Sequence, residues 1–415
     1  MKFKYLLGFL LGFFVLVVVF FVSFSAFRSR DFSANFLYSL QSFMEKKEDA
    51  EKNIEPFEIE KMETPDVIKA VYLTSWSAGR KSKIDYVINL AKTAGVNAVV
   101  IDIKDYSGYV FYDSKLPAVI EYGAKKRRIP DINSLINELH KENIYVIARI
   151  VVFQDPVLAQ NRHDLAIYQK DAISLFLSRF LASVSLWLDN LKLAWVDAAS
   201  EEVWDYNINI AKEVSEMGFD EINFDYIRFP SDGNFKEINY PIWDGKTPRH
   251  LVIKNFFKKV RESLPQVKLS VDLFGLSTIS YDDLGVGQII EDAFEYFDYV
   301  CPMVYPSHYA SGFLGYKNPA EYPYEVVKYS MEMANKRLNA YKQNFETEDK
   351  KINVKIRPWL QDFNLGAVYN SKMVESEIRA VSETLNKEFC GFMLWNSSNF
   401  YTNEALKSTS DFIKN

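Results

Sequence analysis

The chain has 415 residues, which is enough for one large domain or two medium-sized ones. Hydrophobic residues make up 48% of it and charged residues 25%, as in globular proteins that bury a large core. The formal net charge of −6 argues against a nucleic-acid partner, because nucleic-acid-binding domains usually carry a basic stripe. The aromatic content of 15% suits sugar binding and also suits ordinary core packing.

The sequence contains no recognisable metal-binding motif. Its four histidines are scattered, and neither HxH, HExxH nor CxxC occurs. Cys301 and Cys390 lie in apolar, strand-like runs, so we expect buried thiols and no disulfide framework. Residues 231–234 read Ser-Asp-Gly-Asn, which is a turn signal and not a calcium loop. We therefore expect no metal ion and no other cofactor.

The N-terminal region predicts a membrane segment. After a short basic start at residues 1–4, residues 5–27 form an apolar run without a charge, long enough to span a bilayer. A cleaved signal is the alternative: its apolar core is usually shorter, but Ser23 and Ser25 stand at a cleavage-like spacing. We expect a single-pass protein of the cell membrane with an extracytoplasmic domain, or a secreted protein if the segment is cleaved.

Residues 28–66 predict a polar tether. Within them, residues 45–63 are rich in Glu and Lys and contain few large apolar side chains. Such a stretch cannot bury enough surface to fold alone. It would hold the remaining domain, residues 67–415, away from the membrane.

From residue 67 onward, short apolar runs alternate with amphipathic segments. Runs that are apolar at nearly every position are typical of strands buried on both faces, as in parallel sheets. Ser82 and Asp131 are candidate caps of two of the helices, and Gly95 would end the first. The eight strand candidates are Val67–Ser75, Ala98–Lys104, Tyr145–Phe153, Glu221–Phe229, Lys268–Gly275, Tyr299–Ser307, Lys355–Phe363 and Gly391–Asn396.

Eight strand–helix repeats predict an α/β fold, a (β/α)8 TIM barrel. A doubly wound open sheet is the alternative, but residues 74–79 are not the glycine-rich phosphate loop that usually follows its first strand. Residues 154–220 form a connection much longer than one helix requires. In a barrel this connection lies on the catalytic face, where long loops are often functional.

Polar residues interrupt the apolar runs near the carboxyl ends of the strands. Side chains alternate along a strand, so Asn223 and Asp225 share a face, and Asp102 and Lys104 share a face. Asp272 has the equivalent place on the next strand after Asp225. We expect Asp225 and Asp272 to be catalytic. The residues that we expect to bind substrate are Asp102, Lys104, Arg149, Asn223, Arg228, Tyr305, Arg357, Trp359, Gln361, Trp395 and Asn396.

Convergent carboxylates suit glycoside hydrolysis, which needs one acid to protonate the leaving oxygen and one carboxylate to attack or to activate water. Arg149, Arg228 and Arg357 could keep one carboxylate ionised, while an apolar wall keeps another protonated. A purely structural ion-pair network, such as Arg149 with Asp102, is the alternative. Core packing is the alternative for the aromatic residues.

The segment from Gly218 to Pro230, GFDEINFDYIRFP, resembles the signature of a bacterial family of putative glycosyl hydrolases. That family is similar to barrel glycosidases related to alpha-amylases and alpha-galactosidases. The resemblance covers most of residues 67–401. Its further matches are Asp102–Asp105, Asp155–Pro156, Leu165–Ala166, Trp204–Asn207, Pro302–Tyr309, Arg357–Phe363 and Trp395–Asn396.

The resemblance implies that Asp225 matches the nucleophile of the wider superfamily. The chain departs from alpha-amylases at Asn223, where they carry arginine, and it lacks their glutamate acid after strand five. Asp272 is the only strand-end carboxylate there, and Glu291 and Asp362 are further candidates for the acid. Residues 173–184 form an insertion relative to the family.

Two functions follow as hypotheses. The first is a glycoside hydrolase that cleaves an extracellular or cell-wall polysaccharide through Asp225 and Asp272. The second is a non-catalytic glycan-binding or envelope-assembly protein on a degenerate barrel. Both have a carbohydrate partner and a membrane contact through the N-terminal helix.

Overall fold

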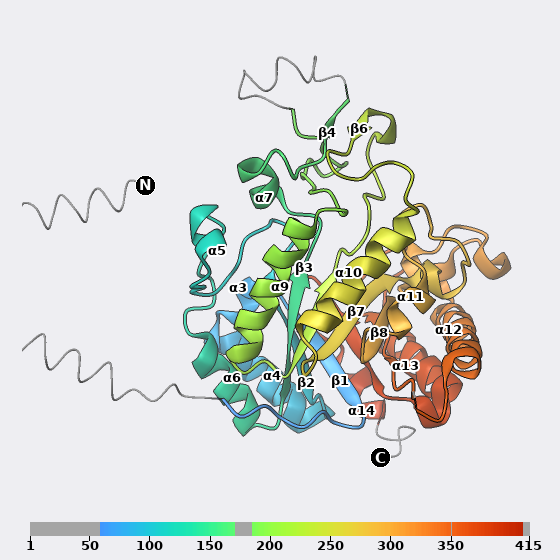
Figure 1. The fold of residues 1–415 in the computed structure, drawn as a ribbon. Coiled ribbons are helices and arrows are strands. Elements are labelled where there is room, and N and C mark those ends of the chain that lie inside the picture. The colour runs from blue at the N-terminus through green and yellow to red at the C-terminus, as the bar shows by residue number, and fades with distance from the viewer. Residues whose placement is uncertain (1–58, 171–184, 350, 410–415) are drawn as a thin grey trace, which may run out of the picture. The chain divides into compact units, whose positions relative to one another are not determined.

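The computed structural model describes residues 59–170, 185–349 and 351–409. Their central feature is a closed parallel barrel with eight strand positions, in which β1 pairs with both β2 and β11 (Figure 1). The predicted TIM barrel is thus confirmed. In barrel order the strands are β1 (Ile68–Leu73), β2 (Ala98–Lys104), β3 (Tyr145–Val151), β5 (Glu221–Asp225), β7 (Lys268–Phe274), β8 (Tyr299–Met303), β9 (Lys355–Ile356) with β10 (Trp359–Gln361), and β11 (Gly391–Trp395).

The seventh strand position is split into β9 and β10. Pro358 lies between them, and proline has no amide hydrogen for the ladder. β8 nevertheless pairs with both pieces, with β9 at Tyr299 and with β10 at Met303. The barrel therefore closes across the interruption.

Helices surround the strands on the outside (Figure 1). Asp131 caps α6 by accepting a hydrogen bond of 3.0 Å from the Ser134 amide, as predicted. Gly95 ends α4 in the left-handed conformation, also as predicted, but Ser82 is not a cap because α4 begins at Lys81. The helices are α3 (Ser75–Ala78), α4 (Lys81–Ala94), α5 (Pro117–Glu121), α6 (Ile132–Lys141), α7 (Pro156–Asn161), α9 (Glu201–Glu216), α10 (Arg249–Ser263), α11 (Ile290–Phe294), α12 (Pro323–Phe345), α13 (Ser371–Leu385) and α14 (Asn403–Ser408).

The long connection between β3 and β5 carries α7, α9 and the short strand β4 (Tyr168–Gln169). β4 pairs antiparallel with β6 (Ile238–Asn239), which comes from the connection after β5. This pair lies beyond the carboxyl ends of the barrel strands (Figure 1). The two connections together therefore build up the face where a barrel carries its site.

The barrel interior is filled by side chains. An apolar cluster that includes Ile68, Ala70, Val100 and Ile147 occupies it, separate from the larger core between strands and helices. The interior also holds a fully buried ion pair between Arg357 and Glu221, the first residue of β5. Arg357 was predicted to bind substrate, but it is fully buried in this ion pair and does not line the cavity at the carboxyl ends of the strands. It lies two residues before Trp359, so it points inward one layer deeper.

Residues 59–66 belong to the predicted tether, but they contact the barrel at the amino ends of its strands. The Met62 amide donates to Asp220, just before β5, at 2.7 Å. Lys61 Nζ donates to Ser215, near the end of α9, also at 2.7 Å. The Ile59 side chain is buried, and Gly218 lies so close to it that a β-carbon there would be 2.6 Å from Ile59 Cβ. The chain thus enters the barrel at the amino ends of the strands.

We expect Ile59→Ala to lower the free energy of unfolding by about 2–5 kcal/mol, because it leaves a cavity at a buried site. Val368→Ala is the matched control, since Val368 is 81% exposed and its truncation should change stability by less than about 0.5 kcal/mol. Urea denaturation of both variants measures this. Equal stability of the two variants would contradict the packing described for residue 59.

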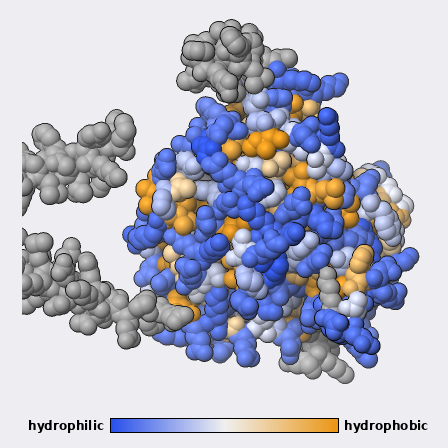
Figure 2. All heavy atoms as spheres, in the orientation of Figure 1, coloured by the Kyte–Doolittle hydropathy of each residue, from blue (hydrophilic) through white to orange (hydrophobic). Residues whose placement is uncertain are grey.

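No helix within the described ranges is both long and apolar enough to cross a membrane. The predicted membrane segment at residues 5–27 and the predicted insertion at residues 173–184 lie outside the described residues. The face drawn in Figure 2 is mainly hydrophilic, with hydrophobic patches separated from one another. Scattered apolar residues of this kind are normal on a folded surface.

Candidate active site

A cavity of about 410 Å³ opens at the carboxyl ends of the strands. Asp225, Met303 and Trp395 are the last residues of their strands, and all three line it. This is the face where barrel enzymes place their active sites. The lining residues are Arg149, Asp225, Tyr226, Arg228, Asp272, Phe274, Gly275, Leu276, Gln288, Met303, Tyr305, His308, Tyr309, Trp359 and Trp395.

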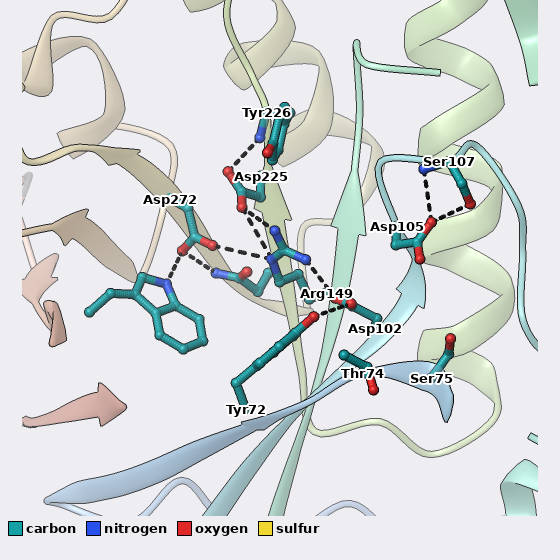
Figure 3. A network of polar contacts seen from close by, with 12 residues as sticks. Tyr72, Thr74, Ser75, Asp102, Asp105, Ser107, Arg149, Asp225, Tyr226 and Asp272 are labelled. Atoms are coloured by element: carbon teal, nitrogen blue, oxygen red, sulfur yellow. Dashed lines mark hydrogen bonds and ion pairs between the residues drawn. The ribbon is translucent and has the colours of Figure 1, made fainter. Parts of the chain in front are cut away.

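The Arg149 guanidinium lies among three aspartates (Figure 3). Its Nη1 donates to Asp102 Oδ1 at 2.5 Å, and its Nε donates to Asp225 Oδ2 at 3.1 Å. The same Nε is 3.8 Å from Asp272 Oδ2. Since all four residues are at most 8% exposed, this cation offsets much of the cost of burying the three carboxylates.

Asp225 is held at a sharp turn that ends β5. The next residue, Tyr226, has a left-handed backbone with φ of 53°, which is costly for an aromatic residue. The Tyr226 amide thereby donates to Asp225 Oδ1 at 2.5 Å. The predicted strand ran on to Phe229 and was wrong at this end, because the turn breaks the alternation. With Arg149 on one oxygen and the Tyr226 amide on the other, the Asp225 carboxylate has a fixed orientation.

Asp272 has a different environment on the neighbouring strand. Its Oδ1 accepts hydrogen bonds from Asn223 Nδ2 at 2.8 Å and from the Trp359 indole at 2.7 Å. Its Oδ2 has no hydrogen-bond partner among the described residues. Burial raises the pKa of the Asp272 carboxyl well above its usual value, the charge of Asp225 adds to this, and Arg149 opposes it. Asp272 is therefore suited to carry a proton on Oδ2.

The two carboxyl groups are close enough to act on one bond. Asp225 Oδ2 and Asp272 Oδ2 both lie near Arg149 Nε, at 3.1 and 3.8 Å. The two oxygens are therefore less than about 7 Å apart, a separation compatible with paired glycosidase carboxylates.

Asp102 lies beneath the cavity and does not line it. Its carboxylate accepts hydrogen bonds from Arg149 and from the Tyr72 hydroxyl (Figure 3). Burial raises the pKa of Asp102 to about 6, against the lowering effects of Arg149 and Tyr72. Asp102 therefore positions Arg149, and the predicted direct contact with substrate is not supported. Tyr72 was missed, although alternation along the first strand gives it an inward face.

Tyr305, Trp359 and Trp395, which were predicted to bind substrate, are part of the cavity wall. The Tyr305 and Trp395 rings are 6.0 Å apart, and Phe363 packs edge-on against Trp395 at 5.0 Å. Trp395 is only partly buried, so its ring can stack on a sugar. Trp359 is 1% exposed and acts mainly through its hydrogen bond to Asp272.

Lys104 was predicted to share a face with Asp102 and does not. The β2–β3 register shifts between these two residues, which rotates Lys104 away from the barrel interior. Its Nζ instead forms a fully buried ion pair with Asp155 Oδ2 at 2.9 Å and donates to the Val151 carbonyl at 2.6 Å. Lys104 is thus a structural residue of the β3–β5 connection.

Other predicted site residues hold the surrounding loops. Gln361 accepts from the Ser307 amide at 3.2 Å and donates to the Phe363 carbonyl at 2.9 Å. Asn396 donates to the Phe400 carbonyl at 2.8 Å. Their side-chain groups are used within these turns, and neither residue lines the cavity.

The two further acid candidates also lie elsewhere. Glu291, on α11, pairs with Arg337. Asp362 accepts from the Thr402 amide at 2.8 Å and from its hydroxyl at 2.6 Å. Neither lines the cavity, so Asp272 remains the only predicted acid that does.

Several lining residues were not predicted. Among them are Tyr226, Phe274 and Met303, none of which was singled out as a site residue. Gln288 and His308 come from loops after β7 and β8, whose conformation no periodic pattern specifies. The only feature of the sequence that could have indicated Gln288 and His308 as site residues is that their side chains are polar.

A family model described as a putative glycosyl hydrolase domain matches residues 70–401. No curated protein matches the sequence. A hypothetical protein from Ruminiclostridium thermocellum ATCC 27405, with a crystal structure, is 38% identical over 52% of this chain and 98% of that chain, with a TM-score of 0.43.

Two more distant structures share the fold. The PgaB (BpsB) glycoside hydrolase domain from Bordetella bronchiseptica is 11% identical, covering 80% of this chain and 95% of that chain, with a TM-score of 0.53. Alpha-L-fucosidase isoenzyme 2 from Paenibacillus thiaminolyticus is 11% identical, covering 83% of this chain and 49% of that chain, with a TM-score of 0.51. At this identity the likeness concerns the barrel alone.

Proposed function

Since this chain belongs to the family described as a putative glycosyl hydrolase domain, we propose that it hydrolyses glycosidic bonds of an extracellular or cell-wall polysaccharide. One observation carries the proposal: Asp225 and Asp272 line one cavity in contrasting environments. Asp225 is paired with Arg149, whereas Asp272 has a raised pKa and an oxygen that accepts no hydrogen bond from any described residue. Pairs of carboxyl groups whose environments separate their pKa values in this way serve as base and acid.

In the reaction that we propose, Asp272 donates its Oδ2 proton to the glycosidic oxygen as the bond to the anomeric carbon breaks. Asp225 attacks that carbon and forms a glycosyl ester. Asp272, now ionised, takes a proton from water, and the water cleaves the ester to release the sugar and regenerate Asp225. Arg149 holds Asp225 in the attacking orientation, and the Tyr305–Trp395 wall supplies a stacking face for the sugar.

We also propose that residues 5–27 hold the domain at the outer surface of the cell membrane. The described chain enters the barrel at the amino ends of the strands, and the cavity opens at the carboxyl ends. Attachment through residue 59 would therefore leave the cavity free for a polymer.

The pH dependence of turnover tests the role of Asp272. Because its pKa is raised, we expect kcat/KM to hold to a higher pH than an ordinary carboxyl acid would allow, and to fall as pH rises through the Asp272 pKa and the acid is lost. Asp272→Asn should remove this alkaline limb and lower kcat by about 10²–10⁴-fold on natural glycans. On aryl glycosides with nitrophenolate leaving groups the variant should lose much less of its kcat, because these leaving groups need no protonation. An unchanged pH profile in the variant would refute the assignment.

A non-catalytic glycan-binding protein is the second candidate. The observation in its favour is that the Asp272 side chain is only 1% exposed, so a substrate oxygen must come close to reach it. Both candidates use the same cavity. Binding of a glycan without release of reducing ends would favour the second candidate.

A further inference from the structure

Arg228 is the second cation of the cavity lining, and it is enclosed by aromatic rings. Its guanidinium carbon lies 4.8 Å from the Trp195 ring centroid, and 4.9 Å from the centroids of both Tyr226 and Phe274. The three rings come from the long β3–β5 connection, from the turn after Asp225 and from the end of β7. Such a setting fixes the guanidinium plane before any ligand arrives.

Within the described part of the chain, this guanidinium has no ion-pair partner. Among the described residues, no carboxylate oxygen lies within 4.0 Å of it, and its hydrogen bond is a long one, from Nη1 to the Phe229 carbonyl at 3.3 Å. Arg149 and Arg357, the other deeply buried arginines of the barrel, each contact at least one carboxylate. Arg228 is only 8% exposed, so an unpaired charge there is costly. Burial lowers its pKa, and Tyr226 and Asp225 oppose this.

We propose that Arg228 binds an anionic group of the substrate, so that the cavity accepts an acidic glycan. The proposal rests on the hydrolase or glycan-binding function of the cavity. Guanidinium groups bind carboxylates, sulfates and phosphates through charge-assisted hydrogen bonds. The donors of Arg228 that no described residue uses are available for such a group, because the residue lines the cavity.

The position of Arg228 specifies where the charge would sit. The ionised Asp225 carboxylate would repel an anionic group placed at the point of bond cleavage. Arg228 follows Asp225 by three residues and lines the same cavity. The anionic group would therefore belong to the sugar that contacts Arg228, beside the region where the bond is cleaved.

The test compares anionic polymers with neutral polymers of the same backbone. The probes are polygalacturonate and hyaluronan, each beside its carboxyl-reduced form, and dextran sulfate beside dextran. The full-length protein is purified in a polyoxyethylene detergent, which carries no sugar. All proteins carry Asp225→Asn to prevent turnover, and binding is measured by calorimetry with and without Arg228→Gln.

We expect binding to at least one anionic polymer, in preference to its neutral form. Arg228→Gln should weaken that binding by about 10–100-fold and change binding of the neutral form by less than twofold, as expected for loss of a charge-assisted contact. The matched control is Arg379→Gln, on α13 outside the barrel, where the side chain is 48% exposed. This control should change neither affinity.

Three results would overturn the proposal: no binding of any anionic polymer, equal binding of anionic and neutral forms, or an equal loss of both in Arg228→Gln. If that variant does not fold, Arg228→Lys keeps the charge but loses the planar fork, and it should weaken binding of the anionic form alone. Hydrolysis is measured separately, on protein with Asp225 intact. A preference for anionic polymers without hydrolysis would refute the proposed reaction and leave this inference standing.

Discussion

The Asp225→Asn variant should lose turnover by about 10⁴-fold or more while keeping its fold and its affinity for glycan. Asparagine has nearly the same shape but cannot attack the anomeric carbon as a carboxylate does. The substitution also removes the negative charge that pairs with Arg149. Release of reducing ends measures turnover, and circular dichroism with urea denaturation measures folding.

Asp205→Asn is the matched control for this result. Asp205 is exposed on α9, outside the barrel, so its replacement should leave turnover unchanged. Turnover by Asp225→Asn at the level of the unmodified protein would remove Asp225 from the mechanism. A loss of turnover together with unfolding would show a structural role instead.

The Arg149→Met variant should lose about 3–5 kcal/mol of unfolding free energy at pH 7. Its guanidinium contacts Asp102 and Asp225 and lies 3.8 Å from Asp272, so its removal leaves buried carboxylates without their cation. At acidic pH the loss should shrink, because protonated carboxyl groups need no compensating charge. Urea denaturation at several pH values measures both effects.

A second substitution tests the cause of that loss. Asp102→Asn, added to Arg149→Met, removes one uncompensated charge and should restore part of the stability. The surface control is Arg162→Met, because Arg162 pairs with the exposed residues Asp164 and Glu202 and its removal should cost at most about 1 kcal/mol. Equal losses for Arg149→Met and Arg162→Met would contradict a central role for the buried network.

The barrel was predictable because its strands and helices repeat with clear periods. Buried parallel strands give apolar runs, and period two placed Asp225 and Asp272 inward on neighbouring strands, where both line the cavity. The Asp131 cap depended on local chemistry alone and was also predicted correctly. These features could be predicted because each depends only on residues that are close together in the sequence.

The failures occur where tertiary contacts override the period. A register shift turned Lys104 outward to Asp155, and a left-handed residue ended β5 at Asp225. The Arg357 side chain points into the barrel as expected, but it lies deeper than the cavity. Alternation along a strand predicts which way a side chain points and not how deep in the barrel it lies. The enclosure of Arg228 by aromatic rings could not be predicted, since the rings of Trp195 and Phe274 come from the β3–β5 connection and from the end of β7.

The central claim, hydrolysis of a glycosidic bond, is tested most directly by incubating the full-length protein with bacterial and plant glycans in ¹⁸O-labelled water. Mass spectrometry of the products then counts the label. We predict new reducing ends that each carry one ¹⁸O atom, because water supplies the oxygen when the glycosyl ester is cleaved. Unsaturated, unlabelled products, or bound glycan without any cleavage, would contradict the account.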